Sequence, residues 1–133
     1  MKTSPVFSNP ANTRFVRVSA KWQWHLHTLL RLRERVRRQS TAHLSAAEQP
    51  HDADHDFADR ASDEREFENL ITEVRSEEVL LSEIDAALER LHDSTYGICA
   101  ETQQAIPADR LRAVPWTRFS RDAAERFEKH GRR

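Results

Sequence analysis

Apolar side chains recur every seven residues along two separate stretches of the chain. The first series comprises Trp22, Leu29 and Val36, with His43 at its fourth position, and the second comprises Phe67, Val74, Leu81 and Leu88. Further apolar residues fill the partner positions of each seam: Leu32 and Ala46 in the first stretch, and Leu70, Ile84 and Leu91 in the second. This repeat is typical of helices that pack against each other along one narrow face. The pattern therefore predicts two long helices that pair along the seam.

A short polar segment separates the two predicted helices. It reads "EQPHDADHD" over residues 48–56, where Pro50 and a cluster of Asp and His break the helical pattern. Helices joined by a short turn pack antiparallel, as a helical hairpin. We therefore expect a mostly α chain with a long antiparallel coiled-coil hairpin over residues 19–92 and its tip at residues 50–61.

The charges of the two predicted helices are opposite in sign. Residues 21–38 hold six basic and one acidic side chain, whereas residues 60–91 hold four basic and ten acidic ones. A basic helix against an acidic helix favours pairing within the chain over self-association, and hence a monomer. For any single pair the charges can equally be solvated flanks, because exposed ion pairs contribute only ~0 to 1 kcal/mol.

The chain outside the hairpin predicts two smaller parts. Residues 1–18 carry Pro5 and Pro10 and predict an extended arm. In residues 93–133, "STYGIC" and "QAIP" predict two short strands around the "AETQ" turn, followed by a short helix from Pro107 and a last helix capped by Ser120. This C-terminal unit has the order of a small zinc ribbon, and at about 40 residues it needs a staple or a neighbour to pack on.

Composition narrows the classes of function. The 133 residues include 32% charged side chains, two glycines and a formal net charge of -1, so no basic field draws the chain to nucleic acid or membrane, and we expect no direct DNA binding. No apolar run has the length of a signal peptide or a membrane span, so we expect a cytoplasmic protein. No nucleophile–base pair, cofactor loop or closed metal site points to an enzyme, and we expect no cofactor.

The single cysteine, Cys99, occupies half of a zinc knuckle. A knuckle needs Cys-x-x-Cys, but the second position is Thr102, and the matching positions of a second knuckle hold Ser120 and Ala123. One thiolate with these partners cannot close a structural zinc site. We expect an apolar core in place of the metal, with Cys99 as a small buried hydrophobe. That predicted core comprises Tyr96, Ile98, Ile106, Leu111, Val114, Trp116, Phe119 and Phe127.

The segment "ALERLHDSTYGICAETQQAIPADRLRAVPWTRF" resembles the DksA/TraR family, whose members typically read Ala-Leu-x-Arg, Tyr-Gly-x-Cys, Ile-Pro-x-x-Arg-Leu and Pro-Trp there. The resemblance covers roughly residues 20–130, and the missing cysteines resemble the family's zinc-independent branch with a degenerate C4-type finger. It implies a regulator of transcription, also in stress responses, that binds RNA polymerase. The hairpin of such a protein enters the secondary channel of the polymerase, and its acidic tip alters initiation.

The tip "HDADHDFADRAS" has three readings: an Asp-rich surface turn, a divalent-metal site, or a functional acidic tip. The family pattern of Asp, two residues, Asp, one residue and Ala matches Asp56, Asp59 and Ala61, so the resemblance implies the functional tip. The spacing of Asp56 and Asp59 places both carboxylates on one face of the second helix.

Two points limit the resemblance. Where some members bind ppGpp through basic residues, this chain has Glu83, Val114 and Ala124, so the resemblance does not extend to that site. The alternative function is a helical-hairpin adaptor that shares the fold but meets another protein partner; such an adaptor does not need the two tip carboxylates.

Overall fold

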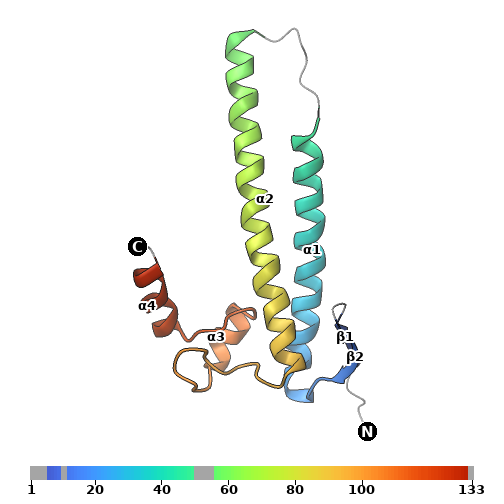
Figure 1. Cartoon of the computed structure of the whole chain (residues 1–133), viewed down its shortest axis with the longest axis vertical. Helices are drawn as coiled ribbons and strands as arrows, with labels where there is room; N and C mark the ends of the chain where they lie inside the picture. The colour runs from blue at the N-terminus through green and yellow to red at the C-terminus, as the bar shows by residue number, and fades with distance from the viewer. Residues whose placement is uncertain (1–5, 10–11, 50–55, 132–133) are drawn as a thin grey trace. The chain divides into compact units, whose positions relative to one another are not determined.

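The computed structural model describes residues 6–9, 12–49 and 56–131, and its elements are shown in Figure 1. They are β1 (Val6–Asn9), β2 (Asn12–Arg17), a 3-10 turn (Ala20–Trp22), α1 (Gln23–Ala47), α2 (Phe57–His92), α3 (Ala108–Ala113) and α4 (Arg121–Gly131). α1 and α2 coincide with the two stretches of seven-residue repeat. The mostly α fold, with a long helical hairpin and a small C-terminal unit, is confirmed. No helix in the described part of the chain has an apolar stretch that would span a bilayer.

The chain forms two compact units. Residues 1–31 and 83–133 form the first unit, and residues 32–82 form the second, so both long helices contribute to each. The division predicted from the sequence, into 1–18, 19–92 and 93–133, follows breaks in the helical pattern and stays a prediction.

Within residues 32–82, α1 and α2 run antiparallel and side by side (Figure 1). The seam positions Val36 and Val74 are buried. His43 of α1 meets two carboxylates of α2, with Nδ1 2.7 Å from Glu77 Oε1 and Nε2 3.1 Å from Glu73 Oε2. Because residues four apart share a helical face, this contact fixes the face that α2 turns toward α1.

The first unit packs the start of α1 and the end of α2 around the C-terminal segment. Its buried side chains include Leu26, Leu29, Ile84, Leu88, Leu91, Tyr96, Ile106 and Leu111. The ring of Trp22 meets Tyr96 edge-on, with centroids 4.9 Å apart. Gly97 has φ +84°, and a Cβ on it would lie 2.9 Å from the Trp22 ring. Only glycine meets both demands without strain, so Gly97 allows the close contact between this loop and the indole.

The N-terminal segment contains paired strands. β1 and β2 are antiparallel, with Phe7 opposite Val16 and Ser8 opposite Phe15. The two prolines predicted an extended arm without strand pairing, although the valine and phenylalanine residues of this segment favour strands.

The C-terminal segment follows the predicted order of elements. The expected strand pair is reduced to one bridge between Ile98 and Ala105. α3 follows Pro107, and Ser120 Oγ accepts a hydrogen bond from the amide of Ala123 over 3.3 Å, which caps α4 as predicted. The prediction that Ile98 and Phe127 belong to the core is wrong, because Ile98 is 40% exposed and Phe127 is 53% exposed.

Candidate functional site

The first candidate site lies at the start of α2. Asp56 stands directly before the helix, and its Oδ1 accepts a hydrogen bond from the backbone amide of Asp59 over 2.9 Å. Its carbonyl accepts a second bond from the amide of Arg60 over 3.0 Å. Asp56 is therefore the N-cap of α2. The carboxylate of Asp56 closes the helix end, and Asp59 lies in the first turn. That the two carboxylates share a helical face stays a prediction.

Both tip carboxylates remain accessible. Asp56 and Asp59 are exposed, whereas Ala61 is half-buried. Negative charge is favoured at a helix N-terminus by ~0.3 to 1 kcal/mol, so the helix itself tolerates this concentration of charge. The remaining acidic and histidine residues of the predicted tip, at 51–55, lie outside the described residues. The interpretation of the tip as a metal site depends on these residues, so it stays a prediction.

Phe57 was missed by the sequence analysis. It is the first residue of α2 and is 87% exposed, between the two tip aspartates. The sequence did indicate that Phe57 has no apolar neighbour on its helix face. Arg60 and Ala61 occupy the positions one turn further on, and neither is a large apolar residue. A large apolar side chain this exposed suits contact with a partner.

The second candidate site is the degenerate knuckle of the first unit. The Cys99 side chain is 0% exposed, as predicted, and its Sγ accepts a hydrogen bond from the amide of Ser120 over 3.4 Å. Burial raises the pKa of the Cys99 thiol, but hydrogen bonds from the Thr102 side chain and from the amides of Ser120, Thr102 and Glu101 lower it to about 6. The loop thus still stabilises a thiolate.

The donor set of the knuckle does not fit zinc. Thr102, Ser120 and Ala123 occupy the sequence positions where a ribbon would offer thiolates, and Ser120 Oγ lies 3.8 Å from the Cys99 sulfur. Among the residues with described positions, no group of three or more His, Cys, Asp or Glu could hold a metal ion. A structural zinc site needs four ligands, so the loops must be held by other means.

Three side chains hold the loop over residues 115–119. Arg90 donates to the carbonyls of Trp116 and Thr117 over 3.0 and 3.3 Å, the Tyr96 hydroxyl donates to the carbonyl of Pro115 over 2.7 Å, and Arg110 donates to the carbonyl of Phe119 over 2.9 Å. Burial lowers the pKa of Arg90, partly offset by Glu83, and burial raises the pKa of Tyr96. Polar anchors, which the sequence analysis did not predict, thus supplement the apolar core.

The three positions that the sequence comparison aligned with basic residues of some family members lie in this unit. Glu83, Val114 and Ala124 are half-buried. That the resemblance does not extend to the ppGpp site stays a prediction.

Comparisons with known proteins agree with these features. The sequence model of the prokaryotic dksA/traR C4-type zinc finger matches residues 94–129. The chain is 36% identical over 104 residues to the RNA polymerase-binding transcription factor DksA of Caulobacter vibrioides, covering 78% of this chain and 73% of that protein. It is 39% identical over 82 residues to general stress protein 16O of Bacillus subtilis, covering 60% and 46% respectively.

A solved structure extends the likeness to the fold. The transcription factor DksA2 from Pseudomonas aeruginosa superposes with a TM-score of 0.72 at 32% identity, covering 86% of this chain and 88% of that chain. The identity to the Caulobacter protein over most of both chains, together with this shared fold, shows that the chain belongs to the DksA/TraR family.

Proposed function

We propose that this chain is a transcription regulator that binds RNA polymerase, places its helical hairpin in the secondary channel and alters initiation through Asp56, Asp59 and Ala61. The observation that carries the proposal is the 36% identity, over 78% of the chain, to a protein named as an RNA polymerase-binding transcription factor. The likeness to a general stress protein supports a role under stress.

The geometry at the start of α2 suits an electrostatic role. Asp56 and Asp59 are exposed at the end of a long helix, and the cap bond to the backbone amide of Asp59 holds the Asp56 carboxylate. Carboxylates held this way act on a metal ion or a basic loop through charge, without covalent chemistry. The small Ala61 leaves room in a narrow channel. We therefore propose a regulator and not an enzyme.

The partner is a protein surface and not DNA. The net charge of -1 gives no phosphate-seeking field. We propose that the chain acts as a monomer in the cytoplasm, and that ppGpp does not modulate it through Glu83, Val114 and Ala124.

Binding to purified RNA polymerase from the organism that encodes the chain tests this proposal. We expect saturable binding with one chain per polymerase, measured by sedimentation or fluorescence anisotropy, and competition by a characterised DksA. A protein that does not bind polymerase, yet copurifies from cells with another protein in a fixed ratio, would instead be the helical-hairpin adaptor.

A further inference from the structure

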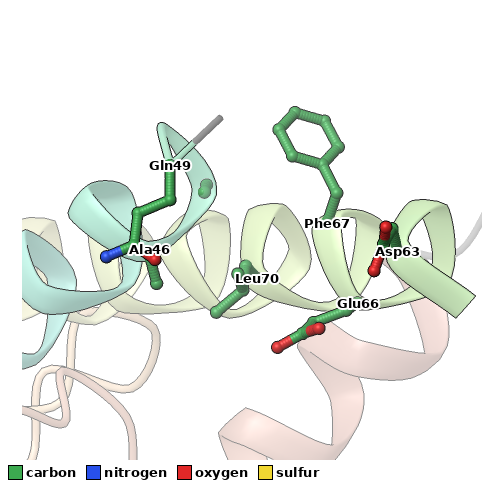
Figure 2. A pocket seen from close by; sticks show the side chains of 7 residues that line it. Ala46, Gln49, Asp63, Glu66, Phe67 and Leu70 are labelled. Atoms are coloured by element: carbon green, nitrogen blue, oxygen red, sulfur yellow. The ribbon is translucent and has the colours of Figure 1, made fainter. Parts of the chain in front are cut away.

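A small pocket opens in the 32–82 unit between the end of α1 and the first turns of α2. Its volume is about 140 Å³, near that of a cavity that takes up one benzene ring. Figure 2 shows that Ala46 and Gln49 come from the α1 side, whereas α2 contributes Asp63, Glu66, Phe67 and Leu70. The pocket therefore combines apolar walls with two carboxylates.

Part of the apolar lining of the pocket is exposed in the described structure. Phe67 occupies a seam position but is 42% exposed, and its seam neighbour Ala46 is also exposed. Further from the loop, Val36 and Val74 close the same seam. The seam is thus left open beside an aromatic ring, which offers apolar surface to a side chain from another molecule.

The two carboxylates of the pocket determine which kind of partner side chain can bind there. Asp63 and Glu66 are three residues apart, so both lie on the same face of α2. Asp63 also takes part in an interaction within the chain, so the exposed Glu66 is the principal acceptor. A purely apolar occupant would desolvate these carboxylates without giving them a partner, which is unfavourable. An acidic occupant would be repelled by them.

Arginine satisfies both parts at once. Its aliphatic stem can cover Leu70 and Ala46, and its guanidinium can donate two parallel hydrogen bonds to a carboxylate. Lysine has a point charge and lacks the planar fork, so it should bind less well. The surroundings also attract a cation, because residues 56–70 carry six acidic and two basic side chains.

We propose that this pocket binds one arginine side chain presented by the protein partner. The proposal rests on the function proposed above only for the identity of that partner, RNA polymerase. The pocket would then supply affinity and register, whereas Asp56 and Asp59 supply the regulatory effect.

The first test uses a probe that does not involve polymerase. We would titrate the full ¹⁵N-labelled chain with N-acetyl-arginine amide and, separately, with N-acetyl-lysine amide, and follow amide chemical shifts. Shifts that saturate with the arginine probe and cluster at Ala46, Glu66, Phe67 and Leu70 are expected, with weaker shifts from the lysine probe. Absent shifts, or equal shifts from both probes scattered along the helices, would overturn the proposal.

The second test measures affinity for RNA polymerase. The double variant Asp63→Asn with Glu66→Gln should bind about tenfold or more weakly, because it removes the charge from the hydrogen bonds to the guanidinium. The matched control is Glu78→Gln, an exposed position of α2 outside the pocket, which should bind like the parent. Phe67→Leu keeps an apolar residue and should lose only the contribution of the ring.

The two tests separate this proposal from the proposed function. If the parent binds polymerase and the double variant binds equally well, the pocket proposal is wrong and the function stands. If the arginine probe binds in the pocket but the parent does not bind polymerase, the proposed function is wrong and the pocket stands. Circular dichroism of each variant checks that the helices are retained.

Discussion

The backbone amide of Ser120 donates a hydrogen bond to the sulfur of Cys99 over 3.4 Å, and this bond joins the two loops between which a zinc ribbon holds its metal. The two loops are joined in this way although three of the four cysteine positions of a zinc ribbon hold other residues. Arg90, Tyr96 and Arg110 anchor the second loop through its carbonyls. The unit therefore has a set of internal bonds that can take over the role of a metal.

Zinc should not contribute to the stability of this protein. Protein purified without chelators should contain far less than one zinc per chain by atomic emission, because Cys99 alone cannot hold the ion. EDTA should leave the melting temperature unchanged. A tightly bound full equivalent of zinc would contradict the donor set described above.

A restored knuckle provides the positive control. The triple variant Thr102→Cys, Ser120→Cys and Ala123→Cys gives both knuckles their Cys-x-x-Cys spacing. It should take up about one zinc per chain and should melt at a lower temperature after EDTA treatment. A triple variant that folds but ignores zinc would show that the loop geometry, and not only the ligands, has changed.

The helices could be predicted from the sequence because the seven-residue repeat includes the residues at which the two helices bury apolar surface. Leu29, Val36, Val74 and Leu88 are all buried seam residues. Toward the loop the same pattern overstates burial, as the exposed Phe67 shows. A periodic pattern identifies the face of a helix, but it does not reveal where the partner helix stops covering that face.

The candidate sites were less accessible to sequence reasoning. Asp56 and Asp59 follow from a motif, but the role of Asp56 as a cap depends on where α2 begins, and element boundaries are the least certain part of such a prediction. The bonds of Arg90 to carbonyls 26 and 27 residues away have no local signal at all. Long-range contacts from side chain to backbone depend on the tertiary fold.

The stability of the C-terminal unit should depend on Arg90. Arg90→Met keeps much of the aliphatic stem but removes the bonds to Trp116 and Thr117, and bonds from a charged group contribute ~1.5 to 3 kcal/mol. We expect the free energy of unfolding in urea to fall by that amount. Arg121→Met, at an exposed position of the same unit, should change it by less than about 0.5 kcal/mol. Equal effects of the two variants would show that the bonds of Arg90 are not stabilising.

A matched pair of apolar truncations tests the observed core. Leu111 is 2% exposed, so Leu111→Ala should lower the free energy of unfolding by ~2 to 5 kcal/mol. Phe127 is 53% exposed and stacks on Phe119 with centroids 5.3 Å apart, so Phe127→Ala should cost only ~0.5 to 1.5 kcal/mol. Thermal and urea unfolding of both variants measure the difference. A larger loss from Phe127→Ala would restore the core first predicted from the sequence.

The lowered pKa of Cys99 predicts a dependence of stability on pH. Its value of about 6 in the folded chain lies below that of a free thiol, ~8.5, so the contribution is present above the unfolded value and is lost as the pH falls toward 6. Between these values, the difference in unfolding free energy between the parent and Cys99→Ala should increase with pH by at most about 1.4 kcal/mol per unit. Urea titrations across this range measure it. Parallel curves for the two proteins would mean that Cys99 is a neutral thiol when folded.

The regulatory effect should depend on charge at the start of α2. Asparagine caps helices about as well as aspartate, so Asp56→Asn preserves the bond that holds the Asp59 amide. Combined with Asp59→Asn, it removes two negative charges with little change in shape. We expect this double variant to bind RNA polymerase like the parent but to lose its effect on the lifetime of promoter complexes in a purified transcription assay.

Asp56→Ala separates charge from helix capping. It removes the cap, which costs ~0.5 to 2 kcal/mol, but retains the charge of Asp59. If charge is the cause, Asp56→Ala should keep part of the regulatory effect and the double asparagine variant should keep none. If the geometry of the helix end is the cause, the order of the two variants should reverse, because only Asp56→Ala loosens the first turn. A double asparagine variant that regulates as well as the parent would show that the acidic tip is only a surface turn. The function would then have to depend on another contact of the hairpin.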